Sequence, residues 1–480
     1  MAISSQGIGS GLDVNSIVTQ LVAIEKQPLT ALKSKASTLQ TQLSLYGTFK
    51  SQASALGDAA ATLALSSGWS LQKVSSSNTN AVTATLSGSA TAASGTLSVE
   101  VEKLAQAQAS ASAGVTAGAA VGAAGTITIQ LGSWSGTPTA QSFAAGATAA
   151  VDVAIANTDT TSQIAAKINA ANAGVVATVL KDGANERLVL KSANTGAAAG
   201  FSVTTAGDAG LAQFAINDAG GPVDSTQTSP ATGMALNQLA QDAKVKINGV
   251  AIAASTNKLT DVVPGVTLQL TQTTTAAATV TVEDDLAGIQ KNVQAFVDAY
   301  NALNTTIANA TKYDASSKTG GPLQGDFTTL GVQSGMRSVV GSTSSGSSFS
   351  RLSDVGIERQ TDGSLKLNAT KFTTALADLP NLKKLFSADN GDVSTNGFGI
   401  KVRDFARGLV SYDGRVSTKS TSLQDALTRN SKDQDKINER ATRVEANLRK
   451  QYAALDTQMA KWTGLNSYVS SQIAQWNKSS

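Results

Sequence analysis

The C-terminal part of the chain carries apolar side chains at heptad spacing, and this pattern constrains the fold more than any other feature. One register holds Leu427, Ala441, Leu448, Leu455, Trp462, Val469 and Trp476, and a second holds Leu423, Ile437, Val444 and Leu465. The offset between the registers alternates between four and three residues, which is typical of a coiled-coil seam. A helix from Leu423 to Trp476 would be about 80 Å long at ~1.5 Å per residue. It cannot bury its own stripe, so it needs a partner helix.

Polar residues interrupt this seam at Asn430, Gln434, Gln451 and Gln458. A polar side chain at a seam position weakens helix association and can fix the register or the number of partners. The sequence therefore predicts a seam that is not tuned for maximal affinity.

A second apolar pattern near the N-terminus supplies the expected partner. Residues spaced by three and four positions form one stripe at Leu32, Ala36, Leu39 and Leu43, and a shorter stripe precedes it at Ile17, Val18, Leu21 and Ile24. Asp13 or Asn15 is expected to cap the first turn. Pro28 lies between the stripes and should kink the helix or begin a new one.

From about Asn78 the apolar period changes to two residues, which indicates strands. Asn248-Gly249 predicts a type I′ hairpin, and we expect Val266–Leu270 and Val280–Val282 to complete one small antiparallel sheet with it. One helix interrupts the strands, with Ser162 as its expected N-cap. Trp134 lies between glycines and serines, so it is expected in an exposed turn.

Helical spacing returns after Asp285, where one broad apolar face runs from Leu286 to Ile307. Two further helices are predicted over 326–340 and 370–379, the second stopped by Pro380. The predicted fold class is α+β with several domains nested in the chain. The expected domains are a coiled-coil leg (1–44 with 420–480), a helical bundle (45–77 with 285–419), an inner β-rich domain (78–103 with 237–284) and an outer β-rich domain (104–236).

Composition excludes several function classes. The chain has no Cys and no His, which excludes a Ser-His-Asp triad and Cys- or His-ligated zinc. The 37 basic and 34 acidic residues are too balanced to indicate a nucleic-acid partner. No apolar run approaches the ~20 residues of a membrane helix, and Met1–Ser10 lacks the regions of a cleavable secretory signal.

Short matches to catalytic or metal motifs carry little weight. Ser70-Leu71-Gln72-Lys73 fits S-x-x-K by two fixed positions in a Ser-rich chain, and Glu283-Asp284-Asp285 is better explained as the acidic start of a helix. We predict no enzyme activity, no cofactor and no metal site.

The ordered motifs of the chain resemble a known family. The opening Gly9-Ser10-Gly11-Leu12-Asp13-Val14, followed by Glu25-Lys26-Gln27-Pro28-Leu29, resembles the start of the bacterial flagellar filament cap family, also called hook-associated protein 2. Ile247-Asn248-Gly249-Val250 with Pro264-Gly265-Val266 resembles the family's second signature. The centre, from Ile164 to Asn169 and on to Leu188-Val189-Leu190, is similar to a repeat of flagellar axial proteins.

This resemblance implies a non-enzymatic cap at the distal tip of the flagellum, outside the cell, where flagellin folds and polymerises and exported subunits are retained. It implies a ring of about four to six copies, with a pentamer favoured. The other implied partners are flagellin, the hook–filament junction proteins and a dedicated export chaperone, with no nucleic acid and no membrane insertion. It also implies export through the flagellar secretion apparatus without a cleavable signal peptide.

The leg and partner contacts are expected at the apolar positions of the two terminal stripes. They are Leu12, Ile17, Leu21, Ile24, Leu39, Leu43, Ile437, Val444, Leu448, Leu455, Trp462 and Val469.

Three other functions compete with the cap. Another axial component, such as flagellin or a junction protein, would share the terminal helices and the central repeat. A surface adhesin would bind host glycans through the β-rich middle. A wall hydrolase would cleave peptidoglycan.

Overall fold

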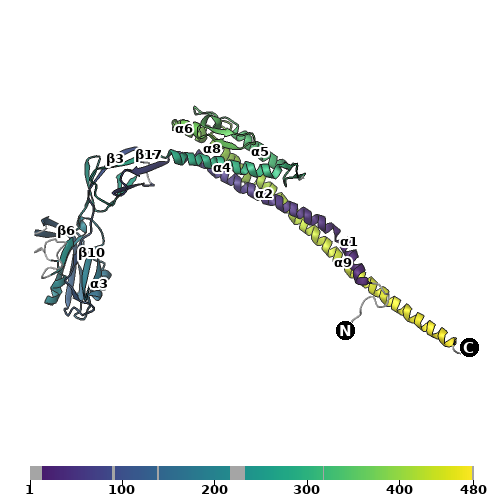
Figure 1. The fold of residues 1–480 in the computed structure, drawn as a ribbon, viewed down its shortest axis with the longest axis horizontal. Helices are drawn as coiled ribbons and strands as arrows, with labels where there is room; N and C mark the ends of the chain where they lie inside the picture. Colours follow the sequence, from purple (N-terminus) through teal and green to yellow (C-terminus); the bar gives the residue numbers. More distant parts are fainter. Residues whose placement is uncertain (1–12, 89–91, 138–139, 217–232, 317, 478–480) are drawn as a thin grey trace. The chain divides into compact units, whose positions relative to one another are not determined.

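The computed structural model describes residues 13–88, 92–137, 140–216, 233–316 and 318–477. The chain forms two units: unit 1 contains residues 1–71 and 286–480, and unit 2 contains residues 72–285 (Figure 1). Unit 1 is therefore built from both ends of the chain, with unit 2 inserted between them. The α+β class with several domains is confirmed.

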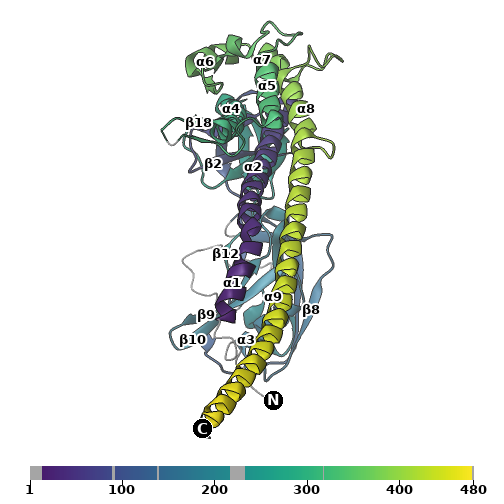
Figure 2. The same ribbon diagram turned by 90° about the vertical axis from the view of Figure 1, so that its right-hand side faces the viewer.

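Unit 1 consists mainly of helices. In chain order they are α1 (Val14–Glu25), α2 (Gln27–Ala64), α4 (Leu286–Thr311), α5 (Phe327–Val340), α6 (Ala369–Leu376), α7 (Leu379–Ser387), α8 (Phe398–Val410) and α9 (Arg415–Trp476). Two small hairpins pair β18 (Tyr313–Asp314) with β19 (Thr319–Gly320) and β20 (Ile357–Arg359) with β21 (Leu365–Leu367). The helices α2 and α9 lie side by side in both views (Figures 1 and 2).

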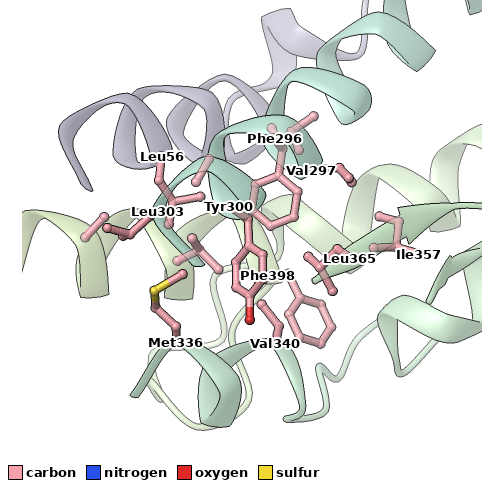
Figure 3. Close-up of a cluster of buried hydrophobic side chains, with 14 of the residues drawn as sticks. Leu56, Phe296, Val297, Tyr300, Leu303, Met336, Val340, Ile357, Leu365 and Phe398 are labelled. Atoms are coloured by element: carbon pink, nitrogen blue, oxygen red, sulfur yellow. The ribbon is translucent and has the colours of Figure 1, made fainter. Parts of the chain in front are cut away.

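The core of unit 1 forms around the apolar face predicted for α4. Phe296, Tyr300 and Leu303 of this helix are buried with Leu56 of α2 and Phe398 of α8 (Figure 3). The helix predicted from Leu286 to Ile307 is confirmed and ends one turn later, at Thr311.

The break between α1 and α2 follows the predicted local chemistry. Asp13 caps α1, because its Oδ1 accepts a hydrogen bond from the Ser16 amide at 3.0 Å. Helix α1 ends at Glu25, and Pro28 lies in the first turn of α2, where its missing N–H costs no hydrogen bond.

Pro380 has a different role from the predicted one. Helix α6 ends at Leu376, before the proline, and Pro380 lies in the first turn of α7. Asp378 caps α7 by accepting from the Asn381 amide, so the proline begins a helix instead of ending one.

The boundary between the units also differs from the expected one. The sequence pattern assigns residues 72–77 to the helical domain, whereas Gln72–Ser76 form strand β1 of unit 2. This segment has little apolar alternation of its own, and its partner strand β17 sets its conformation.

One part of unit 2 contains two antiparallel sheets that share a hydrophobic cluster. The first has the order β1 (Gln72–Ser76), β17 (Ala278–Asp284), β3 (Gly95–Lys103), β13 (Ala243–Ile247) and β14 (Val250–Ala254); the second has the order β15 (Lys258–Val263), β16 (Val266–Leu270) and β2 (Val82–Leu86). The prediction of a single sheet is therefore wrong. Leu268 and Val280 lie in the shared cluster but belong to different sheets. Alternation of apolar residues shows that each segment is a strand, but it does not show which strands pair in one sheet.

The hairpin between β13 and β14 is confirmed. Asn248 and Gly249 have φ angles of 50° and 81°, as a type I′ turn requires. The side chain of Asn248 also accepts a hydrogen bond from the Ser98 amide at 2.9 Å, which ties the turn to β3.

The rest of unit 2 contains two more sheets, a helix and a separate hydrophobic cluster. One sheet has the order β12 (Ala235–Gln238), β4 (Ala109–Ala111), β10 (Asn185–Ser192) and β5 (Val115–Thr116), with β9 (Val175–Asp182) also on β10; the other has the order β11 (Gly200–Gly207), β6 (Gly125–Thr137) and β7 (Ala140–Ala145), with β8 (Val151–Ile155) also on β6. The helix α3 (Thr161–Ala170) packs on β9.

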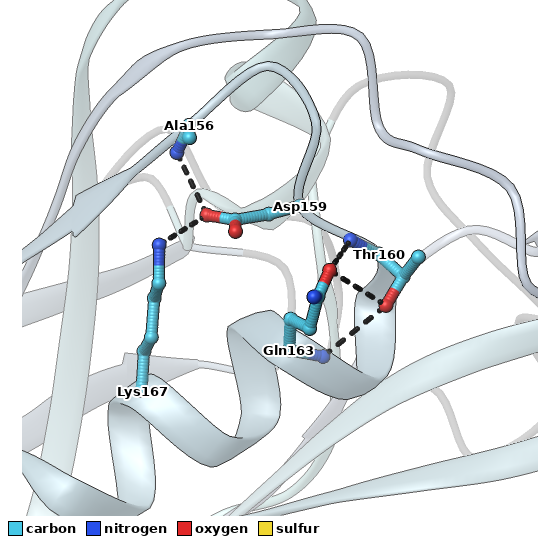
Figure 4. Close-up of polar contacts among 5 residues, drawn as sticks. All are labelled: Ala156, Asp159, Thr160, Gln163 and Lys167. Atoms are coloured by element: carbon cyan, nitrogen blue, oxygen red, sulfur yellow. Dashed lines mark hydrogen bonds and ion pairs between the residues drawn. The ribbon is translucent and has the colours of Figure 1, made fainter.

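The N-cap of α3 is Thr160, not the predicted Ser162. Thr160 and Gln163 bond each other's amides in a capping box, which Ser162 cannot form at its position in the first turn (Figure 4). Beside it, Lys167 pairs with Asp159 at 2.5 Å. This hydrogen bond, together with that from the Ala156 amide, lowers the pKa of Asp159.

Trp134 lies in strand β6, not in an exposed turn. Its Nε1 donates to the Phe201 carbonyl at 3.0 Å, and its ring lies 5.1 Å from that of Phe143 on β7. A Cβ at Gly132 would approach the Phe143 ring to 2.5 Å, so this glycine makes room for the aromatic pair. Gly132, one of the two glycines that suggest a turn in the sequence, therefore serves packing.

Candidate functional site

The terminal helices α1 and α9 form an antiparallel pair. Near one end of α1 the Asn15 side chain accepts a hydrogen bond from Arg449 at 3.0 Å, and at the other end Glu25 pairs with Arg440 at 2.5 Å. Residue numbers fall along α9 as they rise along α1, so the two helices run in opposite directions. The predicted pairing of the chain ends is present in the structure.

Valines spaced by four residues make the buried contact of α1. Val14, Val18 and Val22 are buried with Ala441 of α9, and Leu448 and Tyr452 pack against them. Of these residues, the expected contacts include Leu448 alone. The structure therefore brings Leu448 into the α1–α9 pair.

A different face of α1 carries the residues that the sequence selects as contacts. Leu21 is 39% exposed and Ile24 is 59% exposed, while Ile17 is half-buried. At about 100° per residue, this stripe lies beside the valine stripe and not on it. Leu12 lies outside the described residues.

Helix α2 continues the pairing along α9. Val416, Leu423 and Asn430 of α9 are buried at seven-residue spacing, and Ile437 and Val444 are half-buried further along. On α2, the expected contacts Leu39 and Leu43 are half-buried and pack against the core of unit 1. The second sequence register thus faces the partner helices as far as Val444, whereas Leu465 of the same register is exposed.

Asn430 is the polar residue that the structure buries in this seam. Its Oδ1 accepts a hydrogen bond from Gln434 at 2.7 Å, whereas its Nδ2 has no hydrogen-bond partner. Heptad spacing also predicts Gln451 and Gln458 in the seam, but both are exposed. Gln451 lies outside the buried contacts between α1 and α9, and Gln458 lies past Tyr452, the last α9 residue that packs against that cluster.

Beyond the pair, α9 continues with an apolar stripe that nothing in the described chain covers. Leu455 is 45% exposed, Trp462 is 60% exposed and Val469 is 46% exposed. Met459, Leu465, Tyr468, Ile473 and Trp476 of the same segment are also exposed. Figure 2 shows α9 extending past the start of α1. A stripe of this size exposed to water is typical of an interaction surface.

The carboxylate of Asp326 fixes the base of the paired helices to the core. Lys419 of α9 pairs with its Oδ2 at 2.7 Å, and the Thr329 amide donates to its Oδ1 at 2.9 Å. Burial alone would raise the pKa of Asp326, but Lys419 and the hydrogen bond from Tyr46 lower it to about 2. The carboxylate is therefore charged throughout the physiological range.

Sequence reasoning placed Val18 in the N-terminal stripe but missed Val14 and Val22, the two polar contacts between α1 and α9, and the Asp326 connection. The capping aspartate before α5 gives a local signal at Asp326. The pairing of Glu25 with Arg440 has no local signal, because the residues are distant in sequence.

The residues of the short motif matches do not form a recognisable catalytic or metal site in the described part of the chain. Lys73 of the S-x-x-K match pairs with Glu283 at 3.1 Å across two strands, and both side chains are more than half exposed. Within the described ranges, no three acidic side chains gather where a metal ion could bind. In the same part of the chain, no helix has both the length and the hydropathy needed to cross a membrane.

Family models match the chain in three successive segments. The model of the flagellar hook-associated protein 2 N-terminus matches residues 10–108, the flagellin hook IN motif matches residues 126–194, and the model of the flagellar hook-associated protein 2 C-terminus matches residues 240–464. Together with the paired terminal helices, these segments define an axial protein of the bacterial flagellum.

Two relatives match over nearly the full length of both chains. Flagellar hook-associated protein 2 of Escherichia coli strain K12 is 31% identical over 98% of each chain, and that of Salmonella typhimurium is 30% identical over 100% of each. The chain belongs to the flagellar hook-associated protein 2 family, which consists of flagellar filament cap proteins.

A solved structure supports the same assignment. The crystal structure of the D1-D2-D3 domains of the flagellar cap protein FliD from Escherichia coli has a TM-score of 0.56 and 29% sequence identity, and covers 79% of this chain and 99% of that one. The family identity supports the cap function and not the adhesin alternative. The members of this family are structural proteins of the flagellum, so the family identity places the chain in the flagellum.

Proposed function

We propose that this chain caps the growing tip of the flagellar filament as a ring of about four to six copies, with a pentamer favoured. In this proposal flagellin folds and polymerises beneath the ring, and the cap prevents loss of exported subunits. The chain acts through binding contacts and turns nothing over. Its further partners are the hook–filament junction proteins and an export chaperone, and it leaves the cell through the flagellar secretion apparatus without a cleavable signal.

The observation that carries the proposal is the uncovered apolar stripe of α9. Leu455, Trp462 and Val469 continue the face that α1 covers through Leu448 and Tyr452, but no described part of the chain packs on them. A long apolar helix face gains free energy only when another surface covers it. We infer that the other subunits of the assembly provide this surface.

The outer face of α1 offers a second assembly contact. Ile17, Leu21 and Ile24 form an apolar row on the side that the valines leave free. In a ring this row can contact a neighbouring subunit while the valine row holds α1 on α9. The remaining expected contacts, Leu39, Leu43, Ile437 and Val444, then support the pair from inside.

The test is to supply the chain to cells that lack their own cap protein. We expect restored swimming, the labelled chain at filament tips, and a ring in native mass spectrometry. Label along the whole filament would indicate a different axial component. A purely monomeric chain that restores no filaments would contradict the proposal.

A further inference from the structure

A pocket of about 210 Å³ lies at the end of α5, beside the hairpin of β20 and β21. Its apolar wall includes Val340, Ile357 and Leu365, which belong to the hydrophobic core of unit 1. Its charged wall includes Arg351 and Arg359, which are both exposed. The pocket therefore connects the apolar core to two positive charges at the surface.

Neither of these guanidinium groups is neutralised by a carboxylate. In the described part of the chain, no acidic side chain forms an ion pair with Arg351 or Arg359. The acidic residues next to them have other partners. Asp354 accepts hydrogen bonds from two main-chain amides at 2.8 and 2.9 Å, and Glu358 pairs with Lys371 at 2.8 Å.

A third arginine reaches the same region from α5. Arg337 lies one turn before Val340, and its Nε is buried without a hydrogen-bond partner among the described residues. Its Nη2 lies 3.5 Å from the Asp362 carbonyl, at the limit of a hydrogen bond. The carboxylate of Asp362 accepts instead from the amide and the hydroxyl of Ser364, at 2.8 and 2.7 Å. Arg337 therefore keeps an unused donor.

The buried end of the pocket has one more unsatisfied donor. The Tyr300 side chain of α4 is 1% exposed, and its hydroxyl has no hydrogen-bond partner in the described chain. Figure 3 shows this hydroxyl directed toward Val340, which lines the pocket. Burial raises the pKa of Tyr300, whereas the charges of Arg337 and Arg359 lower it, so both charges act at the hydroxyl. A buried hydroxyl without a partner costs free energy, which a bound acceptor would remove.

The last turn of α5 also carries the negative pole of its helix dipole, which on its own would disfavour an anion. Lys401 of α8 lies against this pole. Its Nζ donates to the Ser342 hydroxyl at 3.2 Å and to the Thr343 carbonyl at 2.5 Å, and Ser342 lines the pocket. A cation at the negative pole leaves the arginine charges to act on a ligand.

We propose that this pocket binds a small free oxyanion of the size of phosphate. Its oxygens accept hydrogen bonds from Arg351 and Arg359 at the mouth and from Tyr300 and Arg337 at the buried end. A guanidinium group presents its donors as a planar fork that matches the oxygens of such an anion. The pocket has several times the ~30 Å³ that one water molecule occupies in the liquid, which leaves room for a four-oxygen anion.

The binding joins α4, α5 and the hairpin of β20 and β21, so it should stabilise unit 1. It goes beyond the proposed cap function and does not depend on it, so either can fail without the other.

Phosphate binding can be measured on the purified full chain. Isothermal titration with sodium phosphate at pH 7 gives the dissociation constant, and urea unfolding gives the change in stability. We expect phosphate to raise the urea midpoint more than sodium chloride of equal ionic strength does. Phosphate also stabilises proteins without binding, through its exclusion from their surface, so a variant without the site must supply the baseline.

A matched pair of double variants provides that comparison. Arg351→Gln with Arg359→Gln should raise the dissociation constant for phosphate at least about tenfold, the effect of losing a charge-assisted hydrogen bond. Arg407→Gln with Arg429→Gln changes the net charge equally at exposed positions of unit 1 and should leave the constant within about twofold of wild type. Equal constants for the two double variants, or an equal midpoint shift in wild type and Arg351/Arg359 variant, overturn the proposal.

Tyr300→Phe tests the buried end of the site. Without phosphate this variant should be as stable as wild type or more stable, because it removes a hydroxyl that has no partner. Its dissociation constant for phosphate should rise at least about threefold, as for the loss of one neutral hydrogen bond. An unchanged constant would exclude the hydroxyl from the site and overturn the proposed binding mode.

A carboxylate of a neighbouring copy has similar chemistry and is a different source of the oxyanion. With that occupant, the Arg351/Arg359 variant would form weaker rings in native mass spectrometry, and free phosphate would not bind to wild type. This result would overturn the proposal of a free ligand.

Discussion

The hydroxyl of Tyr46 donates a hydrogen bond to Oδ1 of Asp326 over 2.5 Å, although the two residues are 280 positions apart in the chain. The other oxygen of the same carboxylate pairs with Lys419. Asp326 also caps α5, so one side chain connects α2, α5 and α9. This carboxylate therefore joins the paired terminal helices to the core of unit 1, in addition to their apolar contacts with it.

The Asp326 connection predicts a pH dependence of stability. The pKa of Asp326 is about 2 in the folded chain, below its ordinary value of 3.8. A lowered folded-state pKa gives stability that is present above the unfolded value and is lost as the pH falls from about 4 toward 2. Asp326→Asn keeps the N-cap but removes the ion pair, and should cost on the order of 1 kcal/mol at pH 7.

Urea unfolding of wild type and Asp326→Asn at pH 7, 4 and 2.5 measures this effect. The difference in free energy of unfolding should shrink as the pH falls. Asp413→Asn, a change at an exposed position of unit 1, is the matched control. A difference that stays constant from pH 7 to 2.5 would show that the Asp326 charge does not stabilise the fold.

Local chemistry explains which parts of the fold could be predicted from sequence. The break at Pro28, the turn at Asn248-Gly249 and the long face of α4 each depend on a signal within a few residues. Trp134 and the division of the strands into separate sheets depend on distant partners, such as Phe201 for the indole. The spacing of apolar residues along the sequence cannot identify those partners.

The candidate site shows the same limit. The apolar residues of α1 surround much of the helix, so the sequence predicts an amphipathic helix but not which stripe faces α9. The contacts of Asn15 and Glu25 with Arg449 and Arg440 set that rotation. The heptad pattern likewise marks Leu455 to Trp476 as apolar, but only the structure places this segment beyond the end of α1.

The two apolar rows of α1 should respond differently to the same substitution. Val18→Asp places a charge in the buried row, at a cost on the order of 2–4 kcal/mol, and should detach α1 from α9. Hydrogen exchange should show faster exchange of the α1 amides while the unit 1 core stays protected.

The exposed row gives the matched comparison. Ile17→Asp, Leu21→Asp and Ile24→Asp together should leave α1 protected in the monomer but abolish ring formation and swimming. Normal swimming in this triple variant would count heavily against the outer face as an assembly contact.

The uncovered stripe of α9 should contribute to assembly and not to monomer stability. Replacing Leu455, Trp462 and Val469 by Ser should leave the urea midpoint of the monomer unchanged, because these side chains are already exposed. The dissociation constant of the ring should rise at least about tenfold, as for the loss of an aromatic anchor. Analytical ultracentrifugation measures the constant, with Lys461→Ser and Ser470→Ala as the control. Equal constants for both variants would exclude the stripe from the ring contacts.

Substitution of Asn430 tests whether weak packing between α2 and α9 is needed for the cap to move during filament growth. Its Nδ2 is buried without a partner, which costs free energy in the paired state. Asn430→Leu should therefore raise the free energy of unfolding of the α2–α9 pair by about 1 kcal/mol, measured by urea titration.

A cap must hold the tip and still yield as each subunit arrives, so a tighter seam should shorten filaments. Asn430→Leu cells should show shorter filaments than cells with Asn438→Leu, a change at an exposed position on the same helix. Electron microscopy of filament length, read beside the unfolding data, decides the point. A more stable seam with filaments of normal length would mean that the buried amide sets the register of α9 on α2 and has no role in elongation.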